Sequence, residues 1–303
     1  MLTPPFLKAG DTIGIIAPGY KIATQQWEQA VPLLESWGLQ VKSGKSLRLK
    51  EQVFAGTDAQ RFDDLSDMMQ NHDIKAILCA RGGYGSVRLL PYFEEYIAVP
   101  EPKWLIGYSD ITVLLTYFTD QLQWKSIHGP MPVDLSEGLS EEQVQSWEYL
   151  RRFLFGQTVS YELSPSLYNR EGEVKALVTG GNLSVLYGLI ATPFQCLTDG
   201  KILFIEEVNE SLHHIDRMMM NMKLSGQLSR LKGLIIGSMS EMKDTTPSFG
   251  KTAQEIIYEH VKEYDYPVMF NFPAGHGGVN YPLVMGADLQ LKITKDLVLI
   301  SFM

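Results

Sequence analysis

The sequence lacks several features that mark common classes of protein. Its 303 residues include only two cysteines, Cys79 and Cys196, which stand far apart and show none of the spacing of a zinc site or a redox pair. Both lie in apolar stretches, so we expect them to be small buried core residues. Basic residues are fewer than acidic ones: the sequence has 26 Lys and Arg and 35 Asp and Glu, which gives a formal net charge of −9. Without a basic excess to neutralise phosphates, a general nucleic-acid-binding protein is not expected.

Long apolar runs are absent as well. The N-terminal residues show no basic region followed by an apolar one, so we expect no secretory signal, and no run approaches the length of a membrane span. We therefore expect a cytoplasmic protein that does not bind membranes. The sequence is 45% hydrophobic and 20% charged, as in ordinary globular proteins, and its length favours two domains.

The first half alternates short apolar runs with longer amphipathic ones, which is typical of a parallel sheet flanked by helices. We predict strands over Thr12–Ala17, Leu39–Lys42, Ile74–Ala80 and the residues before Ser109, and helices over Thr24–Trp37, over Ala59–Gln70 with Asp58 as its cap, and from Ser86. Such sheets bind ligands at the carboxyl ends of their strands. Pro18-Gly19, Arg81–Gly85 and Gly107–Asp110 all fall at those ends.

The polar, turn-rich stretch 155–173 predicts a junction, so we assign one domain to residues 1–160 and another to 161–303. The second half has a mixed order and a β-rich end. We predict strands over Val174–Val178, Lys201–Ile205, Leu231–Ile236, Leu289–Ile293 and Leu297–Phe302, and helices over Leu183–Ile190, Ile215–Leu224 and Thr252–Glu263. A tight turn at residues 294–296 joins the last two strands.

Ser109 lies where an apolar strand pattern meets a helical one with no loop between them. A serine on such a sharp turn projects its hydroxyl, and the amides that follow can bind a developing oxyanion. The Gly107-Tyr108-Ser109-Asp110 pattern lacks the second glycine of the usual hydrolase elbow. The residues around Ser109 therefore predict a nucleophile or a helix N-cap and leave both open.

A serine nucleophile needs a base and a carboxylate that orients the base. His276 stands between Gly275 and Gly277, in a loop open enough for a general base, although an exposed histidine without function has the same pattern. Glu206 ends an apolar run, where a buried carboxylate needs a partner. That partner could also be Arg217 in a structural ion pair.

Four further features of the sequence could contribute to, or compete with, a site built around a serine nucleophile. The Arg81–Gly85 turn does not fit a phosphate-loop pattern, but its amides could complete an oxyanion hole and Arg81 could face a carboxylate. His213-His214 does not predict a metal site, because adjacent helical residues do not face each other. The Met-rich run at 218–222 predicts a core-facing helix. The turn at His128-Gly129-Pro130 could line the same cleft.

Read together, these motifs resemble the LD-carboxypeptidase family, the serine peptidases that include murein tetrapeptide carboxypeptidase and the microcin C immunity peptidases. The resemblance spans nearly the whole chain, and the shared order of the motifs is specific. A departure from the family is Gly19, where many relatives have serine after the proline. The matching runs are Leu7–Asp11, Ala17-Pro18, Phe54–Asp58 with Arg61, Arg81–Gly85, Gly107–Asp110, His128–Pro130, Gly180–Leu183, Leu203–Glu207, Ile215–Met218 and Gly275-His276.

The resemblance implies a fold and a site. The fold is α/β, with an N-terminal flavodoxin-like parallel-sheet domain and a smaller, β-rich C-terminal domain, and the active site lies at their interface. The triad is Ser109, Glu206 and His276, although Glu207 is adjacent and leaves the identity of the acid open. The implied oxyanion donors are the amides of Asp110 and Gly83. We expect substrate contacts from Arg81, Gly82, Tyr84 and Tyr108, with no metal and no cofactor.

The activity implied by the resemblance is removal of the terminal D-alanine from murein tetrapeptides during cell-wall recycling, after a meso-diaminopimelate-type residue. An immunity-type peptidase that cleaves a peptidyl or aminoacyl nucleotide amide is the alternative within the family, although this compact chain offers no obvious insertion for a nucleobase. A non-catalytic binding protein on the same scaffold is the alternative outside it. We expect a small peptide as the partner and, from the family, a homodimer.

Overall fold

The computed structural model describes residues 1–93, 101–135 and 139–302, and divides them into two compact units. The first unit comprises Met1–Thr158 and Tyr281–Val284, and the second comprises Val159–Asn280 and Met285–Met303. Each unit is built around its own sheet. The mixture of parallel sheet, helices and a β-rich second half confirms the predicted α/β fold class.

The sheet of the first unit has the strand order β11-β5-β4-β3-β1-β2. The pairs that join β2, β1, β3, β4 and β5 are all parallel, so this part has the order of flavodoxin-like folds. Almost every residue of β1, β3 and β4 is buried, as expected for strands covered on both faces. The strands are β1 (Thr12–Ile16), β2 (Gln40–Ser43), β3 (Ile74–Cys79), β4 (Trp104–Gly107), β5 (Ser126–His128) and β11 (Leu283–Met285).

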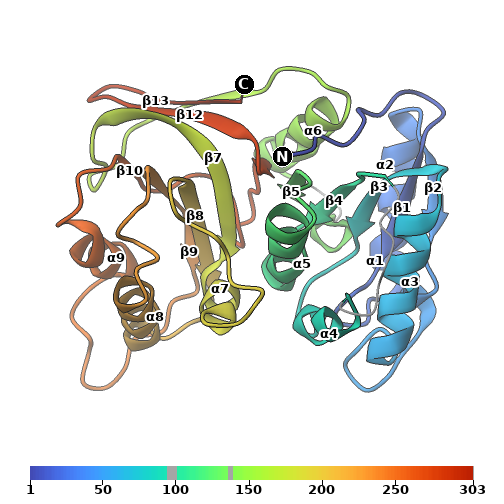
Figure 1. The fold of residues 1–303 in the computed structure, drawn as a ribbon, viewed down its shortest axis with the longest axis horizontal. Helices are drawn as coiled ribbons and strands as arrows, with labels where there is room; N and C mark the ends of the chain where they lie inside the picture. Colours follow the sequence, from blue (N-terminus) through green and yellow to red (C-terminus); the bar gives the residue numbers. More distant parts are fainter. Residues whose placement is uncertain (94–100, 136–138, 303) are drawn as a thin grey trace. The chain divides into compact units, whose positions relative to one another are not determined.

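Helices cover this sheet. Figure 1 shows α5 beside β4 and β5, and α3 packs against β1 and β3. The helices of this unit are α1 (Thr24–Glu28), α2 (Ala30–Ser36), α3 (Asp58–Gln70), α4 (Leu90–Phe93), α5 (Thr112–Thr116) and α6 (Glu141–Leu154). Helix α6 was not predicted, although Ser140 and Gln143 form a capping box at its start.

Two predicted helices differ from the structure in ways that the sequence explains. The single helix predicted over Thr24–Trp37 is divided into α1 and α2 at Gln29. Pro32 lacks the amide that would donate to Glu28, so the helical hydrogen bonding is interrupted at this point. Helix α3 is capped by Thr57 and not by Asp58, because the Thr57 side chain accepts from the Gln60 amide.

The sheet of the second unit has the order β10-β9-β8-β7-β12-β13-β6. It is parallel from β10 to β7 and antiparallel from β7 to β6. Figure 1 shows β7 as a long curved strand that runs from the β12–β13 region to the start of α7. The strands are β6 (Ser160–Leu163), β7 (Gly172–Asn182), β8 (Ile202–Val208), β9 (Gly233–Ser240), β10 (Val268–Met269), β12 (Asp288–Ile293) and β13 (Val298–Phe302).

Three helices complete this unit: α7 (Leu183–Leu189), α8 (Leu212–Leu224) and α9 (Ala253–Val261). Side chains of all three pack with those of β8, β9 and β10 in one apolar core. The three methionines Met218, Met219 and Met222 are buried there, whereas Met220 is exposed, which confirms the predicted core-facing helix. None of the helices in the described ranges is long and apolar enough to cross a bilayer.

Three strands of this unit continue past their predicted ends, and all three matter for the site; β9, predicted to end at Ile236, continues to Ser240. Strand β7 continues to Asn182 because Gly180 and Gly181 pair with β8 and do not form a loop. A Cβ on Gly180 would lie 2.0 Å from the carbonyl oxygen of Phe204, so this close pairing requires glycine. Strand β8 continues to Val208, which places Glu206 and Glu207 inside a strand and not at its end.

Candidate active site

Ser109 follows a fully buried strand and adopts an unusual backbone conformation. Strand β4 ends at Gly107, Tyr108 is extended, and a 3₁₀ turn over Ser109–Ile111 leads directly into α5. The φ angle of Ser109 is +64°, a left-handed value that is uncommon outside glycine. An N-cap residue is normally extended, and Tyr108 holds that position here. The backbone therefore disfavours the helix-cap interpretation and has the strain typical of a nucleophile elbow.

The loop that follows β3 packs closely against this elbow. A Cβ placed on Gly82 would lie 3.0 Å from the Cβ of Ser109 and 3.2 Å from its Oγ. The same position is 3.2 Å from the amide nitrogen of Asp110. Gly82 thus lets one backbone approach the other closely, and a side chain there would crowd Ser109 and Asp110. Gly83 has φ of +101°, and the ring of Tyr20 occupies the space where its Cβ would be.

Asp110 contributes its carboxylate as well as its amide. The side chain is 4% exposed, and its Oδ2 accepts the amide of Ser86 at 2.9 Å. Burial raises the pKa of Asp110, and the hydrogen bonds from the turn oppose that rise. The sequence predicted only the amide as a functional group. The carboxylate adds a fixed link between the elbow and the end of the glycine turn.

The predicted substrate-contacting side chains differ in exposure. Tyr84 is 49% exposed, so it is accessible to a ligand. Arg81 is half-buried, its guanidinium lies over the ring of Tyr20, and one Nη donates to the carbonyl of Lys21 at 3.2 Å. Tyr108 is buried and its hydroxyl donates to Asp134 at 2.7 Å. That geometry favours support of the elbow over contact with substrate.

His128 begins the turn that the sequence suggested as one side of the cleft. It is fully buried at the end of β5, with its ring beside that of Tyr108.

In the second unit, His276 and Glu206 form a hydrogen-bonded pair. The Nδ1 atom of His276 lies 2.7 Å from Oε2 of Glu206, whose side chain is fully buried. Arg217, the other partner considered for Glu206, lies exposed on α8. A buried carboxylate on Nδ1 fixes the orientation and tautomer of the ring, as a triad acid does.

The neighbouring Glu207 has different partners. Its carboxylate accepts the amide of Ser184 at 2.7 Å, the side-chain amide of Asn182 at 2.9 Å and its neighbour's amide, Val208, at 2.9 Å. Burial raises the pKa of Glu207. The side-chain amide of Asn182 also donates to Oε1 of Glu206, at 3.3 Å, so it bridges the two carboxylates. The contacts thus pair Glu206, and not Glu207, with the histidine.

The loop that carries His276 is anchored to the same sheet. The Ser238 amide on β9 donates to the carbonyl of Ala274, and the amide of Gly275 donates to Oδ1 of Asn280. A Cβ on Gly275 would lie 2.5 Å from Oε2 of Glu206 and 2.6 Å from Oγ of Ser238. Glycine is therefore required for the loop to approach the carboxylate. Neither Asn280 nor Asn182 was predicted to take part in the site; the place of Asn182 directly before α7 is the signal that predicts a helix cap.

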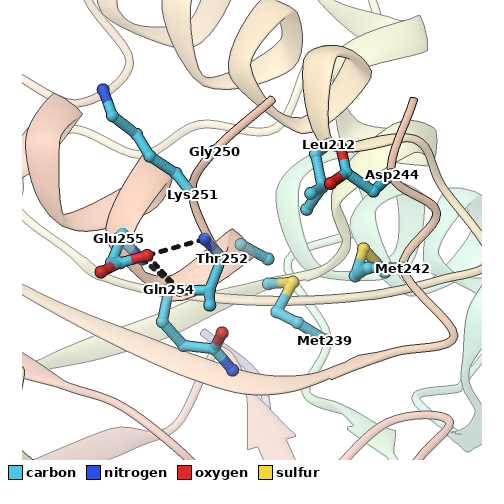
Figure 2. A pocket seen from close by; sticks show the side chains of 10 residues that line it. Leu212, Met239, Met242, Asp244, Gly250, Lys251, Thr252, Gln254 and Glu255 are labelled. Carbon is cyan, nitrogen blue, oxygen red and sulfur yellow. Dashed lines mark hydrogen bonds between the residues drawn. The ribbon is translucent and has the colours of Figure 1, made fainter. Parts of the chain in front are cut away.

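A hollow elsewhere in the second unit contains none of the predicted site residues. It measures about 470 Å³ and is lined by the C-terminal end of β9, the start of α8 and the start of α9 with the loop before it. Figure 2 shows two methionines, Met239 and Met242, at its apolar side and charged residues at its rim. Those charges are already engaged: Glu255 accepts from Thr252, Asp244 from Phe249, and Lys251 pairs with Glu259. Hydrogen bonds and ion pairs between neighbouring residues, such as these, are typical of contacts that stabilise a loop.

His214 likewise has a structural explanation. Its Nδ1 lies 2.5 Å from Oε2 of Glu210, four residues earlier in the chain, and the neighbouring His213 is exposed. In the part of the chain that the structure describes, no three His, Cys, Asp or Glu side chains are grouped as metal ligands.

Comparison with known proteins matches both halves of the chain to domains of one family. Residues 13–129 match the N-terminal domain model of the LD-carboxypeptidases, and residues 175–291 match the C-terminal one. A probable murein peptide carboxypeptidase of Bacillus subtilis is 31% identical over 98% of this chain and 94% of its own length. The microcin C7 self-immunity protein of Escherichia coli is 27% identical over 94% of this chain and 91% of its own.

A solved structure agrees with these matches. The muramoyltetrapeptide carboxypeptidase of Oxalobacter formigenes superposes with a TM-score of 0.86 and 25% identity, over 96% of this chain and 98% of that one. The similarity thus covers both units and extends to their fold.

Proposed function

The chain belongs to the LD-carboxypeptidase family and is a carboxypeptidase of the serine type, and from that premise we propose that it removes the terminal D-alanine from murein tetrapeptides. The observation that carries the proposal is the buried Glu206 hydrogen-bonded to His276. The names of the B. subtilis and O. formigenes relatives support a murein peptide as the substrate. Such a substrate is released by cell-wall recycling, which would place the reaction in the cytoplasm.

In the proposed mechanism, Ser109 attacks the carbonyl carbon of the bond before D-alanine. With Nδ1 engaged by Glu206, Nε2 of His276 takes the serine proton, and the amides of Asp110 and Gly83 stabilise the oxyanion. Collapse of the tetrahedral intermediate breaks the C–N bond, and His276 delivers the proton to the leaving amine. Water then hydrolyses the acyl-serine with His276 again as base. The mechanism requires the two units to bring Ser109 and His276 to one substrate.

Arg81 is the residue that we assign to the terminal carboxylate of D-alanine. Its Nη1 donates to the Lys21 carbonyl, and its Nε is buried and makes no hydrogen bond to any described residue. An anion would therefore meet the Nη edge of the guanidinium, because the buried Nε is not accessible. A planar guanidinium is suited to a carboxylate because it can donate two parallel hydrogen bonds.

The test is mass spectrometry of two substrates incubated with the protein, with and without a chelator. One is a murein tetrapeptide and the other is a peptidyl nucleotide conjugate. We expect loss of D-alanine from the tetrapeptide, unaffected by the chelator and abolished in a folded Ser109→Ala variant. Turnover retained by Ser109→Ala would refute the nucleophile, and turnover that requires metal would refute the mechanism.

The second substrate addresses the alternative activity. The similarity to the microcin C7 self-immunity protein extends over most of both chains, so cleavage of a peptidyl or aminoacyl nucleotide amide is a specific second proposal. Cleavage of the conjugate, with the tetrapeptide left intact, would assign the chain to that branch of the family.

A further inference from the structure

Arg61 is a charged side chain that is completely buried in the first unit. Burying a guanidinium is costly unless its donors are used; both Nη atoms of Arg61 have partners, whereas its buried Nε makes no hydrogen bond to a described residue. Burial lowers the pKa of Arg61, and the neighbouring Asp58 opposes that change. Arg61 lies on α3, far along the chain from Ser109, and the proposed mechanism gives it no function.

The contacts of Arg61 join two loops at the carboxyl ends of the sheet. Its Nη1 donates to the carbonyl of Pro18, which follows β1, and at 3.0 Å to the carbonyl of Gly85, which follows β3. Its Nη2 pairs with Asp58. Its guanidinium lies 5.1 Å from the centre of the Phe54 ring. A planar group with a fixed fork of donors can meet these partners together, whereas a lysine ammonium cannot.

The glycine turn is therefore held at its end from two directions. Arg61 binds the carbonyl of Gly85, and the carboxylate of Asp110 binds the next amide, that of Ser86. Gly85 has φ of +124°, and a Cβ there would lie 2.9 Å from the ring of Phe54 and 3.1 Å from Nη1 of Arg61. The other end of the turn, Gly82, is the residue that packs against Ser109.

We propose that Arg61 is a positioning residue for catalysis, which fixes the Gly82–Gly85 turn so that the Gly83 amide faces the oxyanion formed at Ser109. The inference deepens the proposed function and rests on it for the role of the oxyanion. Its geometrical part, a turn held by Arg61, is independent of which substrate the enzyme cleaves.

The test compares Arg61→Met and Arg61→Lys with Arg88→Met. Arg88 is a matched control because it also pairs with Asp58 and also lies over the Phe54 ring, but its side chain holds neither the Pro18 nor the Gly85 carbonyl. In Arg61→Met we expect kcat to fall by about 10- to 100-fold with KM changed by less than about threefold, since loss of one oxyanion donor costs about 100- to 1000-fold. Arg61→Lys should fall between this variant and wild type, and Arg88→Met should keep the wild-type kcat.

Two further measurements separate positioning from general destabilisation. Hydrogen exchange of the amides of residues 83–86 should be faster in both Arg61 variants than in Arg88→Met, while the amides of α8 and α9 remain unchanged. Labelling of Ser109 by a fluorophosphonate should slow in parallel with kcat. If Arg61→Met does not fold, Arg61→Lys decides the question by the same measurements.

The outcomes distinguish the two proposals. Wild-type turnover and wild-type exchange at residues 83–86 in Arg61→Lys, or in a folded Arg61→Met, would overturn the role of Arg61. Absence of D-alanine release by the wild-type enzyme would overturn the proposed function alone, because the exchange and labelling measurements need no peptide substrate.

Discussion

Two adjacent glutamates on β8 show how neighbouring residues of one type come to differ in function. Glu206 accepts the Nδ1 hydrogen bond of His276, whereas Glu207 accepts two backbone amides and the side chain of Asn182. In the sequence both simply follow an apolar run, and the choice between them could not be made. Their contacts separate them, although Asn182 donates to both carboxylates and the register of β8 shifts between Ile205 and Glu207.

Glu206→Gln should therefore lower activity and leave stability almost unchanged, whereas Glu207→Gln should lower stability and leave activity almost unchanged. In Glu206→Gln the new amide group favours the wrong tautomer of His276, so we expect kcat to fall by about 10³- to 10⁴-fold with little loss of stability. In Glu207→Gln an amide group would face the donors that now bind a carboxylate, so we expect a lower free energy of unfolding, by about 1–3 kcal/mol. The folded Glu207→Gln should retain most of the wild-type kcat.

Steady-state kinetics and urea unfolding of both variants measure these effects. Each variant serves as the other's control, because the substitution is the same and the positions are adjacent. Loss of turnover in Glu207→Gln with wild-type turnover in Glu206→Gln would show that the acid has been assigned to the wrong residue.

At the scale of helices and strands, the predictions succeeded where burial alone decides the structure. The buried runs of β1 and β3 were predicted almost to the residue, and β4 by its place before Ser109, because a strand covered on both faces is a continuous apolar run. Strand β6 was missed, since its alternation of exposed and buried residues lies in a polar stretch that also contains turns. Strand β7 was predicted too short, because Gly180 and Gly181 have the same pattern in a loop as in a tightly paired strand.

The start of β4 depends on a buried lysine, which predicts a pH-dependent stability. Lys103 is 2% exposed, and its Nζ donates to the carbonyls of Asn71 and Ile74. Burial lowers the pKa of Lys103 from 10.5 to about 8, with a smaller contribution from Lys75. Between these two pH values the unfolded chain holds the proton and the folded chain does not. The free energy of unfolding should therefore rise with pH across this window.

Urea unfolding of wild type and Lys103→Met between pH 7 and 11 measures this effect. The difference in unfolding free energy between the two should shift in favour of wild type by about 1–3 kcal/mol across the window. Lys42→Met, at an exposed position, controls for the loss of one lysine. A difference that is independent of pH would show that Lys103 keeps its proton in the folded protein.

At the scale of the whole molecule, the chain crosses between its two units three times, after Thr158, after Asn280 and after Val284. The segment that carries His276 runs from β10 in the second unit to β11, which joins the sheet of the first unit. No pattern in the sequence predicts this return, because Tyr281–Val284 is too short to show a period of its own. The family resemblance implied a fold of two domains, but only the structure shows that residues 281–284 belong to the first unit.

The three crossings predict where a complete triad forms. Exchange of a unit between two copies of the chain would require several connections to be exchanged together, whereas a single hinge suffices in simple domain swapping. On the proposed mechanism we therefore expect Ser109 to work with His276 of its own chain, even if the enzyme is the homodimer that the family resemblance implies. Mixing Ser109→Ala with His276→Ala should then restore no turnover.

The measurement is D-alanine release by the two inactive variants, each purified alone and then mixed after joint unfolding and refolding so that subunits can exchange. Sedimentation of the wild-type protein gives its oligomeric state, and a refolded wild-type sample gives the activity that the procedure recovers. If the triad were shared between subunits of a dimer, half of the mixed population would be heterodimers with one intact site. Recovery near a quarter of the refolded wild-type turnover would thus contradict a triad within one chain. A mixture no more active than the two separate variants would support a triad within one chain.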